Sequence, residues 1–451
     1  PELHPALMVV VTLYAVHHGL AKGSLFMAAG LVKGALPARV VSRSMMAADV
    51  PNIHVGLFYY EADSGQDTAG DRFELTFNGG APGTQLTQLT IDTDKDGLGL
   101  SIGDAFFDTQ AGGLGASLSF PFTVVDQSGI GSVQATVADG GTTLVFNFTG
   151  FDVGEKLVFS IDVDEKGFQP LSSTAVVEGE EFEGSKLFAT FAAPHFFDTK
   201  TDQNDPPRFF DAFSFAGLGL NLPPDNYIPQ GSAEIAPVRT AGVSAILTPV
   251  PLPITIAGTV FNDVNLNNSQ DAGDAGIAGV TVSLLEFDGA AYVATGKTAT
   301  TDAAGNYFID KVLPGTYRLV ESQPAPYFSV GAKAGTVDGL GNGVVTSVDV
   351  LSDIVLLGGQ NSIDNDFAEA LPAQLSGHVY HDADNDGIRE AGEEGIAGVK
   401  VTLERLPSTN PVLGSTFVDV FTDAAGFWSA TGLRPGNYVV RETQPVPFFD
   451  G

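Results

Sequence analysis

The sequence predicts an all-β protein built from several β-sandwich domains. Short aliphatic and threonine-rich runs alternate with Gly, Pro, Asp and Asn turns, and long helical periodicity is scarce after residue 45. The chain has 54 Gly, 26 Pro and 43% hydrophobic residues, which is enough to build real cores. Near the C-terminal end a stretch of roughly 120 residues is repeated, a period typical of tandem folded modules rather than of a solenoid. We therefore expect tandem sandwich modules after an N-terminal β-sandwich region, with one short apolar N-terminal helix.

Composition restricts the function. The formal net charge of −33 argues against nucleic acid and anionic membrane surfaces as partners. It suits a soluble protein in a salty, calcium-containing medium outside the cell. The chain contains no Cys, which excludes disulfides, thiolate metal sites and a cysteine nucleophile.

Residues 1–49 differ from the rest. The run 5–35 is apolar and helical in character, but His17, His18 and Lys22 interrupt it. It weakly resembles one helix of the antiporter-like membrane subunits of respiratory complex I, where an intramembrane Lys and His would belong to a proton path. A mis-joined reading frame and a degenerate signal segment are the other interpretations. We expect no stable membrane insertion.

Residues 50–248 predict one or two β-sandwich domains, because Gly, Asp and Pro turns separate short strands at intervals typical of sandwiches. The segment that starts at Asp92 begins like a calcium loop. In that register Leu100 falls at position 9 and Gly103 at position 12, while Asp104 lies one residue further on. The segment is therefore either a calcium site or an acidic turn.

A proline-rich linker at 249–253 precedes two copies of one unit, residues 253–370 and a truncated copy at 372–451. The paired segments are 256–261 and 375–380, 276–282 and 395–401, 301–305 and 422–426, 314–317 and 435–438, and 321–324 and 442–445.

The second copy carries the stronger candidate metal loop, residues 382–393. Oxygen-bearing side chains fall at positions 1, 3, 5, 9 and 12, a glycine at 6 and a backbone carbonyl at 7, which is the EF-hand-type spacing for Ca²⁺. Carboxylates this close repel one another unless a cation lies among them. The predicted ligands are Asp382, Asp384, Asp386, Ile388 through its carbonyl, Glu390 and Glu393.

The first copy repeats the loop at residues 263–274. Its predicted ligands are Asp263, Asn265, Asn267, Asp271 and Asp274. Asn268 replaces the glycine, and Asn tolerates a left-handed backbone. Only three side-chain ligands are charged and position 12 is the shorter Asp, so we expect this loop to bind calcium more weakly than the second.

Through these motifs, both copies resemble the B-type repeats of serine–aspartate-repeat bacterial surface proteins (SdrD B-like domains), related to collagen-adhesin B-type modules. The resemblance covers residues 253–451 and implies immunoglobulin-like sandwiches on a cell-surface stalk that Ca²⁺ makes rigid. Some collagen-adhesin modules also carry a Lys–Asn crosslink that needs a buried Glu. Glu321 and Glu442 occupy that position, but neither first strand has a Lys, so we expect no crosslink.

The function expected is a non-enzymatic, calcium-binding structural or adhesive module of a secreted or cell-surface bacterial protein. The alternative is a ligand- or carbohydrate-binding adhesin head in residues 50–248, whose partner would be a host or matrix protein or a glycan. An exported hydrolase is a third hypothesis, but no paired acid/base constellation supports it. We expect Ca²⁺ as the bound cofactor, no nucleic acid partner, and an extracellular location at the cell surface.

Overall fold

The computed structural model describes residues 50–62, 69–115, 118–167, 179–222, 228, 239–409 and 412–449. The expected N-terminal helix in residues 5–35 lies outside these residues. Within them the protein is all-β, which confirms the predicted fold class, and the helix present, α3 (Gly179–Phe182), has four residues. In the same part of the chain, no helix is long and apolar enough to cross a membrane.

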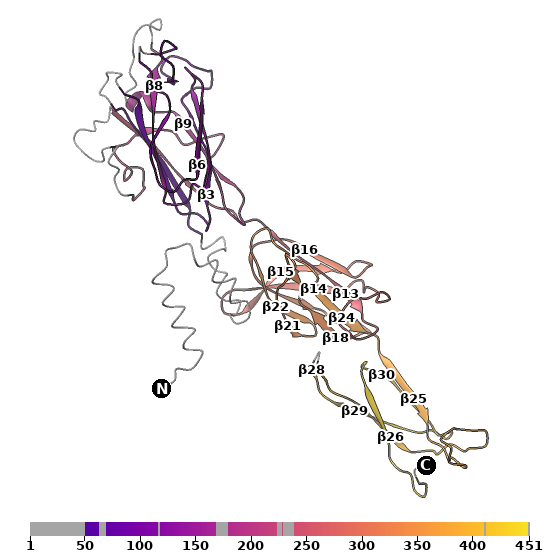
Figure 1. Cartoon of the computed structure of the whole chain (residues 1–451). Coiled ribbons are helices and arrows are strands. Elements are labelled where there is room, and N and C mark those ends of the chain that lie inside the picture. Colours follow the sequence, from indigo (N-terminus) through magenta and orange to yellow (C-terminus); the bar gives the residue numbers. More distant parts are fainter. Residues whose placement is uncertain are drawn as a thin grey trace, which may run out of the picture. The chain divides into compact units, whose positions relative to one another are not determined.

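The N-terminal sandwich consists of two sheets, whose β3, β6, β8 and β9 are labelled in Figure 1. One has the order β11-β12-β1-β2-β8-β4, with β5 also paired to β8, and the other has the order β10-β9-β3-β7-β6. The strands are β1 (Ile53–Tyr60), β2 (Asp71–Asn78), β3 (Gln85–Asp92), β4 (Ala105–Asp108), β5 (Thr123–Gln127), β6 (Ser132–Val137), β7 (Thr143–Thr149), β8 (Lys156–Glu165), β9 (Lys186–Ala192), β10 (Thr199–Lys200), β11 (Phe210–Asp211) and β12 (Thr240–Leu247).

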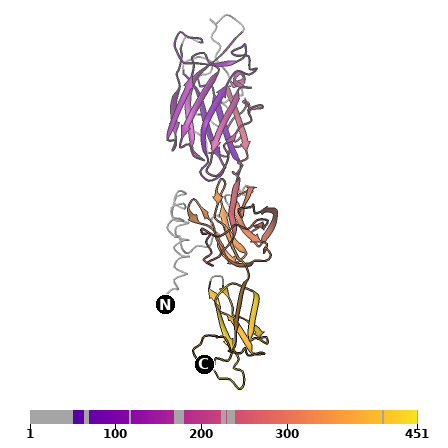
Figure 2. The ribbon, with the colours of Figure 1, turned by 90° about the vertical axis from the view of Figure 1, so that its right-hand side faces the viewer.

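Aromatic side chains fill the space between these two layers, which Figure 2 shows in indigo and magenta. Phe73 and Phe159 stack with ring centroids 4.7 Å apart. Phe146 belongs to the opposite sheet, and its ring centroid lies 4.9 Å from that of Phe159. Alternation along β9 and β7 turns every second residue inward, as the period of a half-buried strand requires. Burying several rings of this size supplies much of the driving force for folding the domain.

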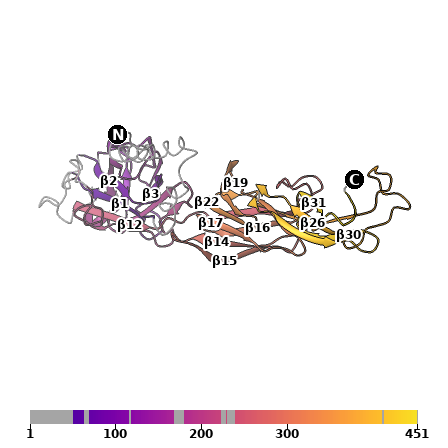
Figure 3. The same cartoon turned by 90° about the horizontal axis from the view of Figure 1, so that it is seen from below.

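The first repeat is a second sandwich with its own core of aliphatic residues and tyrosines. One sheet has the order β16-β13-β24-β18, with β23 paired to β13, and the other β15-β14-β17-β22-β21; Figure 3 labels β14, β15, β17 and β22. The strands are β13 (Ile254–Asn262), β14 (Thr281–Phe287), β15 (Tyr292–Thr300), β16 (Asn306–Val312), β17 (Gly315–Glu321), β18 (Phe328–Lys333), β19 (Thr336–Val337), β20 (Leu340–Gly341), β21 (Val344–Ser347), β22 (Val350–Leu356), β23 (Asn361–Ser362) and β24 (Asp366–Ala370).

The second repeat reproduces the first half of that sandwich. The pair β25-β30 corresponds to β13-β16, and the sheet β29-β26-β31 corresponds to β15-β14-β17. Its strands are β25 (Ala373–His378), β26 (Lys400–Arg405), β27 (Ser408–Thr409), β28 (Val412–Leu413), β29 (Thr416–Phe421), β30 (Phe427–Leu433) and β31 (Tyr438–Glu442). Trp428, the only Trp in the chain, packs in its core.

Candidate metal centre

The loop at residues 382–393 follows β25 and folds around its first and last carboxylates. Asp382 accepts hydrogen bonds from the N–H groups of Asn385 at 2.6 Å and Gly387 at 2.8 Å. Glu393 closes the loop, because its two oxygens accept from Ala383 N at 2.8 Å and Glu390 N at 3.0 Å. The N–H of Gly387 is the main reason that the pKa of Asp382 is lowered, so this group is held as a carboxylate.

Three of the predicted ligands in this loop come together. Carboxylate oxygens of Asp382, Asp384 and Glu393 all lie within 4.8 Å of one another. Oxygens that bind one Ca²⁺ at about 2.3–2.6 Å are separated by at most about 5 Å, so this spacing suits a calcium ion. The carboxylates of Asp386 and Glu390 are not in that group; one oxygen of Asp386 accepts from Ile388 N at 2.7 Å instead.

The loop at residues 263–274 has similar internal bonds, although position 1 accepts from position 5 here and from position 4 in the other loop. Asp263 accepts from Asn267 N at 3.2 Å and from Asn268 N at 2.7 Å. At position 12, Asp274 accepts from Val264 N and from Asp271 N, the same positions that Glu393 contacts in the second loop. Asp263 is fully buried, whereas its counterpart Asp382 is half-buried.

The two loops also share their backbone conformation. Residues at positions 4, 6 and 11 have positive φ in both loops: 61°, 61° and 113° in the first and 63°, 78° and 108° in the second. The left-handed backbone expected at Asn268 is therefore confirmed. The residues are Leu266, Asn268 and Gly273, and Asn385, Gly387 and Gly392.

The loops differ in what faces Asp271 and its counterpart Glu390. The amide nitrogens of Asn265 and Asn267 donate to one oxygen of Asp271 at 3.0 and 2.6 Å. These bonds lower the pKa of Asp271 and satisfy its charge within the loop. Calcium binding here would require both amides to turn their oxygens toward the ion.

The other repeated motifs hold the loop ends in place. Thr301 and Thr422 each donate to the carbonyl of an isoleucine that follows the loop, Ile277 at 2.6 Å and Ile396 at 2.7 Å. A Cβ on Gly395 would lie 2.0 Å from a backbone oxygen of the opposing turn, so only glycine fits there. The motifs are therefore one packed unit at the exit of each loop.

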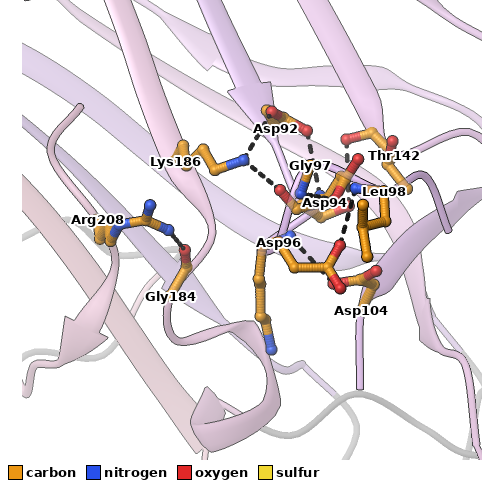
Figure 4. A network of polar contacts seen from close by, with 12 residues as sticks. Asp92, Asp94, Asp96, Gly97, Leu98, Asp104, Thr142, Gly184, Lys186 and Arg208 are labelled. Atoms are coloured by element: carbon orange, nitrogen blue, oxygen red, sulfur yellow. Dashed lines mark hydrogen bonds and ion pairs between the residues drawn. The ribbon is translucent and has the colours of Figure 1, made fainter. Parts of the chain in front are cut away.

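A third loop of the same design lies between β3 and β4 (Figure 4). Carboxylate oxygens of Asp94, Asp96 and Asp104 lie within 4.8 Å of one another. Asp94 accepts from Gly97 N at 2.6 Å and Gly99 N at 2.8 Å, the bonds that Asp382 makes as position 1. The register that starts at Asp92 is therefore wrong: position 1 is Asp94, and the loop is one residue shorter than the other two.

Asp104 closes this loop as Glu393 closes the second. It accepts from Lys95 N at 3.0 Å and Ser101 N at 2.8 Å, and a left-handed glycine precedes it, as in the other loops. Sequence spacing indicated this segment but not its register, because a fixed twelve-residue template does not allow a deletion. Burial alone would raise the pKa of Asp94, but hydrogen bonds from Gly99 and Gly97 and the charge of Lys186 lower it.

This loop already has ammonium groups beside it. Lys186 pairs with Asp92 at 3.4 Å and donates to the Asp94 carbonyl. Lys95 donates to Gly103 O at 2.7 Å. These positive charges offset part of the acidic cluster, so the demand for a bound cation is smaller than at residues 382–393.

Comparison with known proteins identifies the family of the two repeats. A family model described as the SdrD B-like domain matches residues 254–368 and 373–449, which confirms the resemblance in both repeats. Serine-aspartate repeat-containing protein C of Staphylococcus aureus strain N315 is 33% identical over 187 residues. The aligned part covers 42% of this chain but only 18% of that relative. The protein of the same name from strain Newman is 32% identical over the same shares of the two chains.

Solved structures give weaker similarities. The Bacillus anthracis TIE protein is aligned over 86% of this chain and 52% of its own, at 11% identity and a TM-score of 0.22. GBS52, the minor pilin of Streptococcus agalactiae, is aligned over 44% of this chain and 84% of its own, at 16% identity and a TM-score of 0.21. At these scores the similarities carry no further argument.

Proposed function

We propose that the two SdrD B-like domains of this chain are calcium-binding structural modules of a bacterial cell-surface protein. The role is mechanical rather than catalytic, with Ca²⁺ held in the loops 263–274 and 382–393. The observation that carries the proposal is the convergence of Asp382, Asp384 and Glu393 within 4.8 Å in a loop of EF-hand-type spacing. The family resemblance supports the location outside the cell.

Calcium acts in this proposal by linkage. The ion binds the folded loop and not the unfolded chain, so binding adds to the free energy of unfolding. Extracellular modules bind calcium with Kd on the order of 10⁻⁴–10⁻³ M, and 10 mM Ca²⁺ then adds about 1.4–2.7 kcal/mol. For a domain of this size that corresponds to a rise in melting temperature of roughly 6–20 °C.

The test is thermal unfolding of the whole chain followed by tryptophan fluorescence. Since Trp428 is the single Trp and is buried in the second repeat, its emission reports the unfolding of that repeat alone. We expect a higher midpoint in 10 mM Ca²⁺ than in chelator, with Mg²⁺ much less effective. Glu393→Gln should remove most of the calcium effect. Equal midpoints in calcium and in chelator would show that the loops are acidic turns and not calcium sites.

A second candidate function is ligand binding by the N-terminal sandwich. A shallow depression on the sheet β10-β9-β3-β7-β6 combines amide, hydroxyl and ammonium groups with an aromatic ring, which suits a glycan. Its lining consists of Gln88, Thr90, Phe188, Thr190, Lys200 and Gln203. Saturable binding on a glycan array that Phe188→Ala abolishes, without lowering the melting temperature, would support this function; an empty array would argue against it.

A further inference from the structure

Three acidic side chains that do not belong to the loop 263–274 meet between the sheets of the first repeat. Glu321 ends β17, Asp349 directly precedes β22, and Glu369 reaches them from β24 in the facing sheet. The N–H of Glu321 donates to the carbonyl of Asp349 at 3.0 Å, which holds these two residues together. Carboxylate oxygens of all three lie within 4.8 Å of one another. We call this group the buried triad.

Two members of the triad are buried, Asp349 is half-buried, and most of the triad's carboxylate oxygens lack a hydrogen-bond partner. Glu321 is 4% exposed and Glu369 is 0% exposed. Among the described residues, the carboxyl of Glu369 is the one group that can share a hydrogen bond with the carboxyl of Glu321, which requires a proton on one of the two. One oxygen each of Asp349 and Glu369 accepts no hydrogen bond from a described donor. The other oxygen of Glu369 accepts from the amide of Gln323. Buried acceptors of this kind are rare in folded proteins, so each calls for an explanation.

In the described part of the chain, no basic side chain forms an ion pair with the triad. Among the described residues, the ion pair that β24 makes is between Asp366 and Lys333 at 3.7 Å, and none involves a triad member. Burial and the neighbouring carboxylates raise the pKa of Glu321, and burial raises that of Glu369. Uncompensated buried carboxylates are strongly disfavoured, so the triad must hold either protons or a cation.

We propose that Glu321, Asp349 and Glu369 together bind a calcium ion in a site distinct from the loop 263–274. Carboxylate oxygens are the donors that hard divalent cations prefer, and oxygens within 4.8 Å of one another are close enough to share one Ca²⁺ at about 2.3–2.6 Å. A divalent ion neutralises two of the three charges at once. The three ligands stand on or beside strands, so the ion links the last strand of the module to the facing sheet.

The triad is also connected to the first loop. The N–H of Asp263, position 1 of that loop, donates to the carbonyl of Glu369 at 2.7 Å. An ion in the triad therefore fixes the strand that supports the entrance of the loop. The inference shares its metal with the proposed function but uses none of the loop residues, so the two can fail independently.

The test counts calcium ions bound to the whole 451-residue chain by equilibrium dialysis with radioactive Ca²⁺. We expect Glu321→Gln to bind one calcium fewer per chain than the unaltered protein. Glu369→Gln should lose the same ion, so the double variant should lose no more than either single variant. Glu286→Gln is the matched control, because Glu286 is a half-buried glutamate on β14 of the same module, outside the triad.

Loop variants separate the two proposals. Asp274→Asn with Glu393→Gln should lose the loop ions and keep the triad ion. If the loop variants lose calcium and the triad variants do not, the triad inference is wrong and the proposed function stands. If only the triad variants lose calcium, the proposed function is wrong and the inference stands.

Stability distinguishes a bound cation from bound protons. Glu321→Gln removes a repelling carboxylate, so in chelator the first repeat should melt at the same or a higher temperature, while its gain from calcium should fall by several degrees. An unchanged calcium count with higher stability in chelator would show that protons fill the triad and would overturn the inference. Asp349→Asn, at a half-buried position, gives the same comparison if the buried variants do not fold.

Discussion

Position 6 of each metal loop has a backbone that L-residues rarely adopt. Gly387 has φ of 78° and Asn268 has φ of 61°. A Cβ added at Gly387 would meet nothing within 4 Å, so a substitution there changes only the backbone energy. The choice of residue at this position is therefore a matter of left-handed geometry and not of packing.

This geometry predicts that different substitutions at Gly387 lower the stability of the second repeat by different amounts. Gly387→Ala should destabilise the second repeat by about 1–2 kcal/mol, because a left-handed alanine is strained. Gly387→Asn should cost clearly less, since Asn tolerates this region and occupies the equivalent position in the first loop. Urea unfolding in chelator, followed by Trp428 fluorescence, measures both. Equal costs for the two variants would contradict the backbone explanation.

Position-3 and position-5 residues predict the order of affinity. Asn265→Asp with Asn267→Asp removes the amides that donate to Asp271 and adds two charges, so calcium should bind the first loop at least about tenfold more tightly, or about 1.4 kcal/mol. The matched reverse change, Asp384→Asn with Asp386→Asn, should weaken the second loop. Isothermal titration of each variant with Ca²⁺ provides the comparison. Affinities that do not respond to either exchange would disprove the ligand assignment.

At the scale of elements, the repeated Pro-Gly turns end in a tyrosine that fixes the next strand. The hydroxyl of Tyr317, near the start of β17, donates to Leu313 O at 2.6 Å. The hydroxyl of Tyr438, at the start of β31, donates to Arg434 O at 2.7 Å. Both bonds run four residues back along the chain. The turn and its strand are thereby held as one unit in each repeat.

We expect removal of the tyrosine hydroxyl to lower the stability of its own repeat. Tyr438→Phe should destabilise the second repeat by about 1 kcal/mol, because the Arg434 carbonyl loses its partner while the ring still packs. Tyr380→Phe is the control, since that hydroxyl makes no hydrogen bond with the described residues. Denaturant unfolding monitored at Trp428 gives the difference. A Tyr438→Phe variant as stable as the control would show that water replaces the bond.

At the scale of the whole molecule, the described residues form separate cores for the N-terminal sandwich and for each repeat. Differential scanning calorimetry should therefore resolve more than one transition. Addition of Ca²⁺ should raise the transitions of the two repeats more than that of the N-terminal sandwich, whose loop has Lys186 and Lys95 beside it. NaCl at matched ionic strength should reproduce little of this shift, although the chain has a net charge of −33. A uniform shift of all transitions would indicate screening instead of specific binding.

Sequence alone determined the loops 263–274 and 382–393, the paired turns and the all-β class, because each depends on residues close together in the chain. Spacing encodes a local loop directly, and its left-handed positions appear as Gly or Asn. Tertiary structure decided two things. It placed Asp94 and not Asp92 at the start of the third loop, because Asp104 bonds to Lys95 and Ser101 across a deletion. It also brought Glu321, Asp349 and Glu369 together, since strand pairing and the packing of two sheets join residues that no local pattern connects.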